Sequence, residues 1–296
     1  MSLNPHSDFR DVSKPSPASL PTKAFRPVRV QLQTHFQPIY ELRVSSHENH
    51  SYVFPTIKGF EALTRATLLN KQDVDMRSLI DACRFLSRAL EKIKSGLHDV
   101  DPDELFVSIN FSPQTLSLAN LTDQVSETLE SYAINPRSIK IEIIEDPFAE
   151  NDFNQIFSNI QKLSAAGHPV VMDDMLTASS DFDRLSLLRD YLTGVKIDKS
   201  FFNLPYEEQS AVISKLQGTE VTFEGLETPE HIEIALELDA RLVQGFILNK
   251  PMPMSEALHL FVDTRTYPPR PEISHIFIKR NIRNSKTGDD PSPMVA

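Results

Sequence analysis

Glycine is scarce in this chain of 296 residues, which contains 8 glycines and 21 prolines. At the average usage of ~7 %, the same length would hold roughly 20 glycines. Neither G-x-G-x-x-G nor G-x-x-x-x-G-K-[ST] occurs, so the glycine-rich loops that bind nucleotide phosphates through backbone amides are excluded. Any segment that needs an unusual backbone conformation has few glycines from which to build it.

Cysteine and long apolar segments are also in short supply. Cys83 is the one cysteine, which excludes an intramolecular disulfide and favours a reducing compartment, the cytoplasm. No run of about 18 apolar residues occurs, so we expect no membrane span. Residues 1–20 lack the apolar stretch of a secretory signal. Apolar residues still make up 40 % of the chain, which is enough for a large core.

Positive charge is concentrated at the two ends of the sequence. Residues 1–30 and 264–296 each carry a net charge of +3, whereas residues 31–263 carry −17. So acidic a central segment is a poor nonspecific binder of nucleic acid polymers. An anionic partner would need something that inverts the local charge, and a divalent metal held by carboxylates does this.

Composition divides the chain into three regions. Residues 1–29 are rich in Ser and Pro and are predicted to be a disordered arm, and residues 264–296 form a basic, Pro-containing tail. Between them, residues 30–263 alternate short apolar strands with amphipathic helices, as in a parallel sheet covered on both faces. Roughly eight such units over ~235 residues favour a closed (β/α)₈ barrel. An open doubly wound sheet is the alternative.

The individual elements follow from apolar periodicity and capping residues. The expected strands are 30–36, 52–60, 105–110, 139–144, 169–172, 194–197, 220–223 and 242–243. The expected helices are 76–93, one that opens at Ser112-Pro113, and then 152–163, 182–188, 206–216, 229–238 and 255–261. Cys83 lies on the apolar stripe of the first helix and is expected in the core. His168 precedes a strand and is expected in a surface loop.

Polar side chains close seven successive predicted strands, and in a barrel the carboxyl ends of the strands meet at one rim. One such carboxylate is usually a helix cap. Together they would bring about five negative charges into one pocket, where they could not all stay ionised without cations. The main residues of this set are Glu61, Asn110, Glu142, Asp173, Asp174, Lys196, Glu224 and Gln244.

The ligand chemistry of this set favours Mg²⁺ or Mn²⁺ over zinc, because the donors are carboxylate oxygens and one carboxamide. The neighbouring Asp173 and Asp174 would place one carboxylate between two ions, and two ions ~4 Å apart are typical of in-line attack on a phosphodiester. Strand alternation leaves Glu142 facing the barrel lumen. Lys196, between two apolar residues, is either a rim salt bridge or a lysine that holds the attacking water.

Eight short motifs occur in order from about residue 30 to residue 261. They are Phe36-Gln37-Pro38-Ile39, Gly59-Phe60-Glu61-Ala62-Leu63-Thr64-Arg65, Ile109-Asn110-Phe111-Ser112, Ile141-Glu142-Ile143-Ile144-Glu145, Met172-Asp173-Asp174, Val195-Lys196-Ile197-Asp198, Glu224-Gly225-Leu226-Glu227-Thr228 and Gln244-Gly245-Phe246. Together they resemble the EAL domain family, bacterial phosphodiesterases of the second messenger cyclic di-GMP. The resemblance implies an α/β fold, a modified TIM-type (β/α)₈ barrel with one antiparallel strand.

The resemblance also implies an activity and a set of roles. The implied reaction is metal-dependent hydrolysis of cyclic di-GMP to linear pGpG by in-line attack of water at two Mg²⁺ or Mn²⁺ ions. The residues that resemble metal ligands are Glu61, Asn110, Glu142, Asp173, Asp174 and Glu224, with Asp173 bridging. The implied catalytic residues are Lys196, which would hold the water, Glu224 and Glu61. The implied substrate-binding residues are Gln37, Leu63, Arg65, Glu227 and Gln244, and Glu145 would brace the loop after the aspartates.

One segment departs from the family pattern. After the two aspartates the family usually continues Phe-Gly-Thr-Gly-Tyr-Ser-Ser, whereas residues 175–181 of this chain read Met-Leu-Thr-Ala-Ser-Ser-Asp. Leu176 and Ala178 therefore stand where the family has glycine, which reaches positive φ without cost, and we expect the loop to take another path. In the family this loop contributes to dimer contacts and regulation, which implies a homodimer and a regulatory protein partner as candidate assemblies.

Two alternatives to an active phosphodiesterase stay open. The altered loop is also compatible with a catalytically weak or inactive EAL protein that acts as a cyclic di-GMP receptor or a protein-binding regulator. An unrelated metal-dependent barrel with a lysine base, of the enolase type, is disfavoured by the ordered motifs.

Overall fold

The structure is a computed structural model that describes residues 32–47, 50–66, 69–97, 101–144, 152–176 and 180–263. The predicted arm at 1–29 and the predicted tail at 264–296 lie outside these described residues. No helix within the described part of the chain is long and apolar enough to cross a membrane.

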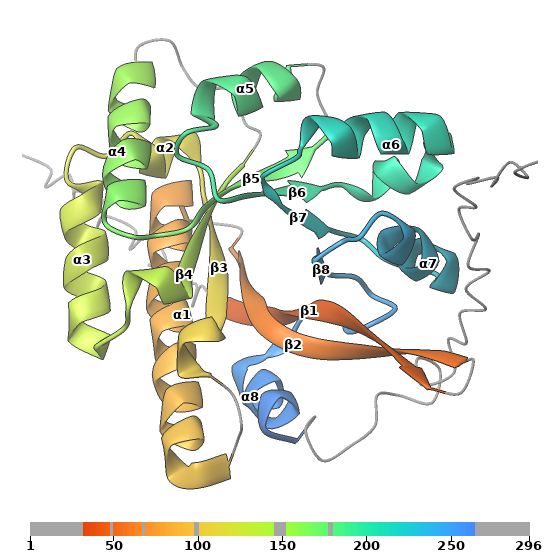
Figure 1. Ribbon diagram of the computed structural model, residues 1–296. Helices are drawn as coiled ribbons and strands as arrows, with labels where there is room; N and C mark the ends of the chain where they lie inside the picture. Colours follow the sequence, from red (N-terminus) through yellow and green to blue (C-terminus); the bar gives the residue numbers. More distant parts are fainter. Residues whose placement is uncertain are drawn as a thin grey trace, which may run out of the picture. The chain divides into compact units, whose positions relative to one another are not determined.

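Eight strands close into a barrel, with a ninth strand added to β1 (Figure 1). The strands are β1 (Gln33–His47), β2 (His50–Arg65), β3 (Phe106–Phe111), β4 (Ile139–Ile143), β5 (Val170–Met175), β6 (Gly194–Ile197), β7 (Glu220–Phe223), β8 (Leu242–Val243) and β9 (Met252–Pro253). Neighbours from β2 to β8 run parallel, whereas β1 runs antiparallel to both β2 and β8 and closes the barrel between them. The predicted modified barrel with one antiparallel strand is confirmed, and the open doubly wound sheet is wrong.

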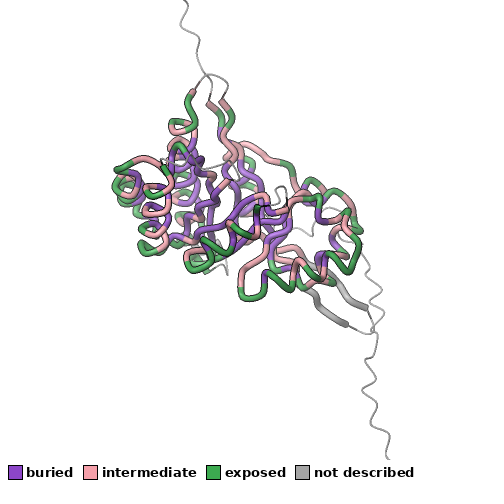
Figure 2. Tube along the Cα trace, turned by 90° about the horizontal axis from the view of Figure 1, so that it is seen from above, coloured by how far each residue is buried: buried purple, intermediate pink, exposed green. Residues whose placement is uncertain are grey.

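Helices follow the parallel strands and cover the barrel. They are α1 (Lys71–Lys92), α2 (Pro113–Leu116), α3 (Leu121–Tyr132), α4 (Phe153–Ala165), α5 (Asp181–Leu188), α6 (Tyr206–Lys215), α7 (Pro229–Glu237) and α8 (Met254–Asp263). Side chains cap the N-termini of several helices. Asn70 accepts a hydrogen bond from the Asp73 amide at the start of α1, and Thr228 accepts one from the His231 amide at the start of α7. Figure 2 shows the buried residues gathered in the strands and on the inner sides of the helices.

An aromatic cluster joins α1 to the first two strands. The ring of Phe85 on α1 lies 4.7 Å from the ring of Phe36 on β1 and 4.7 Å from the ring of Phe60 on β2, measured between centroids. All three side chains are fully buried, as is Cys83, whose place in the core is confirmed. Such burial of apolar surface is the main stabilising contribution to the fold.

The first two strands are longer than predicted, because they pair with each other along their whole length. The register runs from Gln33 opposite Arg65 to His47 opposite His50. Glu61 therefore lies inside β2 rather than just after its end.

Three other differences concern α3, β9 and His168. Helix α3 was not predicted, although its buried residues Leu121, Val125 and Leu129 recur at a spacing of four. The two-residue strand β9 was not predicted either. The expectation that His168 lies on the surface is wrong: it is 3 % exposed, and its Nδ1 atom is 3.2 Å from the carbonyl oxygen of Ile139. Burial lowers the pKa of this imidazole, so its neutral form is favoured.

Phe85→Ala is expected to lower the free energy of unfolding by about 3–5 kcal/mol, because it empties the space between two other rings. Urea denaturation followed by circular dichroism measures this change. Leu187→Ala, at a side chain that is 49 % exposed, is the control and should change the value by less than about 0.5 kcal/mol. Equal losses in the two variants would contradict the assignment of the aromatic cluster to the core.

Candidate active site

The ammonium group of Lys196 lies among four carboxylates at the centre of the barrel. Lys196 is in β6 and its side chain is 3 % exposed. Its Nζ atom is 2.7 Å from Glu224 Oε1, 2.8 Å from Glu142 Oε2, 3.1 Å from Asp173 Oδ1 and 3.4 Å from Glu61 Oε2. These carboxylates come from β2, β4, β5 and the residue after β7, so the lysine contacts groups from four separate strands.

Strand register explains why these side chains meet. Asn110 on β3 is opposite Glu142 on β4, and Gln37 on β1 is opposite Glu61 on β2. Paired residues in neighbouring strands point to the same face of a sheet, and in a closed barrel one face is the lumen. A lysine on β6 can reach Glu142 on β4 only across that lumen. The structure therefore brings together the predicted metal ligands on β2, β3, β4 and β5.

The side-chain amides of Asn110 and Gln244 orient Glu61. Asn110 Nδ2 donates to Glu61 Oε1 at 2.9 Å, and Gln244 Nε2 donates to Glu61 Oε2 at 2.8 Å. The other amide oxygens, Asn110 Oδ1 and Gln244 Oε1, are buried and have no hydrogen-bond donor among the described residues. A buried acceptor without a partner costs about 1–3 kcal/mol. The oxygen of Asn110 next to a carboxylate therefore fits a ligand of a hard cation.

A second group of oxygens lies beside the first. One oxygen each from Asp173, Asp174 and Glu224 can be chosen so that all three lie within 4.8 Å of one another. Such an all-oxygen set is the donor chemistry that Mg²⁺ and Mn²⁺ prefer. Asp174 has a φ of +49°, an uncommon conformation for a residue other than glycine.

Burial and mutual repulsion control the ionisation of these carboxyls. Burial raises the pKa of Glu142 to about 8 and that of Asp173 to about 6, although the nearby ammonium of Lys196 opposes both shifts. Burial also raises the pKa of Glu224 well above its usual value. Burial would raise the pKa of Glu61 too, but the charge of Lys196 and the two amide hydrogen bonds hold it below its usual value. One ammonium thus leaves negative charge in excess, which cations would neutralise.

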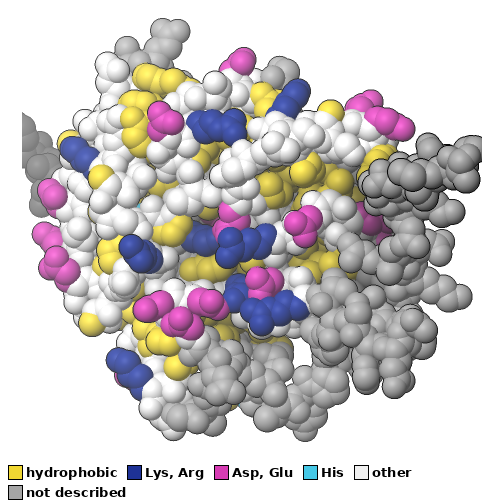
Figure 3. All heavy atoms as spheres, in the orientation of Figure 1, with side chains coloured by type: hydrophobic (Ala, Val, Ile, Leu, Met, Phe, Trp, Pro, Cys, Tyr) yellow, Lys and Arg dark blue, Asp and Glu magenta, His cyan; other side chains and the backbone are white. Residues whose placement is uncertain are grey.

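The pKa of Lys196 is raised well above its usual value, although burial alone would lower it. The four carboxylates around it favour the charged form more strongly than burial disfavours it. On the face that Figure 3 shows, acidic and basic side chains are interspersed over the surface. The carboxylates around Lys196, by contrast, are largely buried, with side-chain exposures between 1 % and 17 %.

Close contacts require glycine at two motif positions in the loops after β7 and β8. A Cβ atom on Gly245 would lie 2.2 Å from the carbonyl oxygen of Leu226, and one on Gly225, which has a φ of +62°, would lie 2.7 Å from Lys199 Cβ. Glu227, in the same loop, has a side chain that is 51 % exposed and lies 3.1 Å from the Lys199 ammonium. This predicted substrate-binding residue therefore lies at the solvent edge of the site.

The other predicted substrate-binding residues lie on β1 and β2. Leu63 and Arg65 share a face of β2 with Glu61, because side chains alternate along a strand. Gln37 is buried and donates to the carbonyl oxygen of Asn249 at 3.1 Å. Glu145, the predicted brace, lies outside the described residues.

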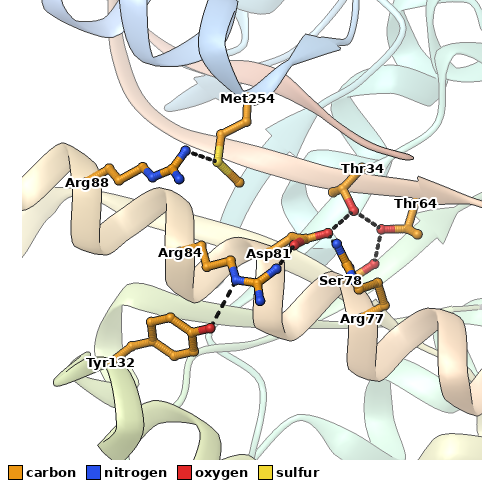
Figure 4. A network of polar contacts seen from close by, with 9 residues as sticks. All are labelled: Thr34, Thr64, Arg77, Ser78, Asp81, Arg84, Arg88, Tyr132 and Met254. Carbon is orange, nitrogen blue, oxygen red and sulfur yellow. Dashed lines mark hydrogen bonds and ion pairs between the residues drawn. The ribbon is translucent and has the colours of Figure 1, made fainter. Parts of the chain in front are cut away.

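A polar network on α1 supports the first two strands next to the site (Figure 4). Thr34 on β1 donates to Asp81 Oδ2 at 2.7 Å, and its hydroxyl is 2.8 Å from that of Thr64 on β2. Ser78 donates to the Thr64 hydroxyl at 2.6 Å. Asp81 is also paired with Arg77, with 2.7 Å between Asp81 Oδ2 and Arg77 Nε. These contacts tie α1 to the strands that carry Gln37, Glu61 and Arg65.

Another carboxylate of α1 holds the loop after β3. Asp75 Oδ2 accepts hydrogen bonds from the Ser112 amide at 2.8 Å, the Ser112 hydroxyl at 2.7 Å and the Thr115 hydroxyl at 2.7 Å. Ser112 follows Asn110 by two residues. Sequence reasoning missed these supporting residues, although Asp75, Ser78 and Asp81 form a polar row at spacing three on a helix with many apolar positions.

Residues 24–251 of the chain match the EAL domain. The chain belongs to the EAL domain family. The cyclic di-GMP phosphodiesterase NbdA from Pseudomonas aeruginosa is 28 % identical over 237 residues, which cover 76 % of this EAL chain and 29 % of NbdA. The oxygen sensor protein DosP from Escherichia coli K12 is 32 % identical over 158 residues, which cover 51 % of this chain and 19 % of DosP. The chain thus spans less than a third of the length of these relatives.

Solved structures of EAL domains have the same fold. The EAL domain of Mycobacterium smegmatis DcpA matches with a TM-score of 0.64 and 24 % identity, covering 81 % of this EAL chain and 100 % of that chain. The PaMucR phosphodiesterase, in its c-di-GMP complex, matches with a TM-score of 0.61 and 23 % identity, covering 77 % and 94 % of the two chains. Both likenesses agree with the barrel topology described above.

In EDTA, the thermal unfolding midpoint of the wild type is expected to fall as the pH rises from about 5 to 8. The folded-state pKa values of Asp173 and Glu142, about 6 and about 8, exceed their usual values of 3.8 and 4.5. Their contribution to stability is therefore complete below pH 3.8 and is lost as the pH rises through about 6 and then about 8. Differential scanning calorimetry of the wild type and of Glu142→Gln measures this effect, since the variant lacks the titration of Glu142 and should lose less. Equal slopes would contradict the raised pKa of Glu142.

Proposed function

We propose that this EAL domain hydrolyses cyclic di-GMP to linear pGpG with the help of two divalent cations, Mg²⁺ or Mn²⁺. The observation that carries the proposal is the cluster of four carboxylates around the Lys196 ammonium, with the buried amide oxygen of Asn110 beside it. Membership of the EAL family supports the reaction class, and so does the similarity to NbdA, a cyclic di-GMP phosphodiesterase.

The oxygen donors divide into two sets that share Asp173. Glu61, Asn110, Glu142 and Asp173 would hold one cation. Asp173, Asp174 and Glu224 would hold the second, which the close approach of their oxygens supports. Bound cations would neutralise the excess of carboxylate charge, activate water and polarise the phosphate oxygens.

The remaining groups have roles that follow from their chemistry. Lys196 presents an ammonium with three donors beside Asp173 and Glu224, so it can donate to the attacking water and hold it in line with the phosphorus–oxygen bond that breaks. Arg65 would bind a phosphate oxygen, because its planar fork forms paired, charge-assisted hydrogen bonds. Gln37, Leu63, Glu227 and Gln244 would position the dinucleotide around this rim.

A receptor for cyclic di-GMP without turnover is the second candidate function, and one observation favours it. Leu176, two residues after Asp174, has a φ of +81°. For a bulky side chain this conformation costs about 1–3 kcal/mol. Strain so near the aspartates would weaken cation binding if nothing offset it. Isothermal titration calorimetry, together with chromatography of the products, separates the two candidates. A receptor binds the dinucleotide tightly and releases no pGpG.

Incubation with cyclic di-GMP and Mg²⁺ or Mn²⁺ is expected to yield pGpG, measured by liquid chromatography. Glu61→Gln should lower turnover by at least about 100-fold, because it removes the charge of a cation ligand. The same carboxylate is contacted by Asn110, Gln244 and Lys196. Glu91→Gln, at an exposed position of α1, is the matched control and should match the wild type.

Either of two results would contradict the proposed hydrolysis. One is the absence of linear product from folded wild-type protein with both metals. The other is equal turnover in the wild type and in Glu61→Gln, which would place the reaction away from the carboxylate cluster.

A further inference from the structure

The backbone just after the two aspartates adopts a conformation that its residues do not favour. Asp174 has a φ of +49° and Leu176 a φ of +81°. Leu176 stands where the family pattern has glycine, and it keeps a positive φ without glycine's freedom. Leu176 thus has a backbone conformation that glycine adopts without cost, and the path of the loop through residues 177–179 lies outside the described residues. Something must stabilise the left-handed backbone here.

The side chain of Asp181 makes a direct contact with this strained residue. The amide of Leu176 donates to Asp181 Oδ2 at 2.9 Å. Asp181 is the first residue of α5 and is 1 % exposed, so the hydrogen bond is shielded from water. A charge-assisted hydrogen bond to a buried carboxylate contributes about twice as much as one between neutral groups. Asp181 stands where the family pattern has serine, so two departures from the pattern meet at this contact.

Arg184 links the same carboxylate to the neighbouring strand. Its Nη1 atom is 3.8 Å from Asp181 Oδ1, and its Nη2 atom donates to the carbonyl oxygen of Ile144 at 3.1 Å. Ile144 follows Glu142 by two residues, just as Leu176 follows Asp174. The first turn of α5 therefore connects the ends of β4 and β5, which carry three of the predicted cation ligands.

We infer that Asp181, oriented by Arg184, is a positioning residue that holds Asp173 and Asp174 in place by stabilising the left-handed backbone at Leu176. The inference rests on the proposed function, because it concerns the cation ligands of that site. Asp181 contacts neither substrate nor cation in this scheme. Glycine at position 176 would adopt positive φ at no cost, whereas Leu176 needs the hydrogen bond to Asp181 to stabilise this conformation.

A double-mutant cycle in the full chain tests this role through Mn²⁺ binding, measured by calorimetry without substrate. Asp181→Ala should weaken Mn²⁺ binding by about 10-fold or more. The same change in a Leu176→Gly background should cost less than about 3-fold, because glycine adopts positive φ unaided. Asp181→Asn keeps an acceptor and should retain much of the affinity, and Arg184→Gln should weaken binding by a smaller factor than Asp181→Ala.

The matched control is Asp183→Ala, because Asp183 is also an aspartate of the first turn of α5 but is exposed. This variant loses the same favourable charge at the helix N-terminus and should bind Mn²⁺ like the wild type. Equal losses from Asp181→Ala in the Leu176 and Leu176→Gly backgrounds would overturn the inference. Wild-type affinity in Asp181→Ala would also overturn it.

The same variants separate this inference from the proposed function. If the wild type bound no Mn²⁺ at all, the proposed function would fail. The coupling between Leu176 and Asp181 would still be measured by urea unfolding in EDTA. There, Asp181→Ala should destabilise the wild-type background more than the Leu176→Gly background, and equal destabilisation would refute the contact as a brace.

Discussion

One buried ammonium surrounded by carboxylates from four strands is the constraint on which the rest of this molecule depends. A buried charge is tolerated only when it is well paired, and Lys196 has its partners only when β2, β4, β5 and β7 are all in register. A slip of one residue in any of these strands would turn the carboxylate out of the lumen and bring an apolar neighbour in. The charge cluster therefore specifies the alignment of the barrel, while the excess of carboxylates leaves it suited to cations.

Helix α1 serves the core and the site at once. Its Phe85 packs between rings from β1 and β2, while Asp81 and Asp75 hold the polar edges of β1, β2 and the loop after β3. Because the same rigid helix contacts all three, the separation between Glu61 and Asn110 is maintained by packing as well as by their mutual hydrogen bond. Preorganisation of this kind reduces the cost of assembling a site when a ligand arrives.

The sequence predicted the barrel, because short apolar strands in alternation with amphipathic helices have few other closed arrangements. It also predicted that Glu142 faces the lumen, since strand alternation is a local rule. It did not predict α3, nor the burial of His168, whose place depends on the carbonyl group of Ile139. Asp181 was missed for a similar reason: its partner is a backbone amide, which no side-chain pattern reveals.

The antiparallel closure has a consequence for synthesis on the ribosome. Strand β1 pairs with β2 as a local hairpin, but it also pairs with β8, where Tyr40 lies opposite Val243 and Glu41 opposite Leu242. The contact of Gln37 with Asn249 spans 212 positions of the chain. A nascent chain must therefore hold an open β-edge, which is prone to mispairing, until residues beyond 243 have emerged. Closure of the barrel, and with it the contact of Gln244 with Glu61, is among the last events of folding during translation.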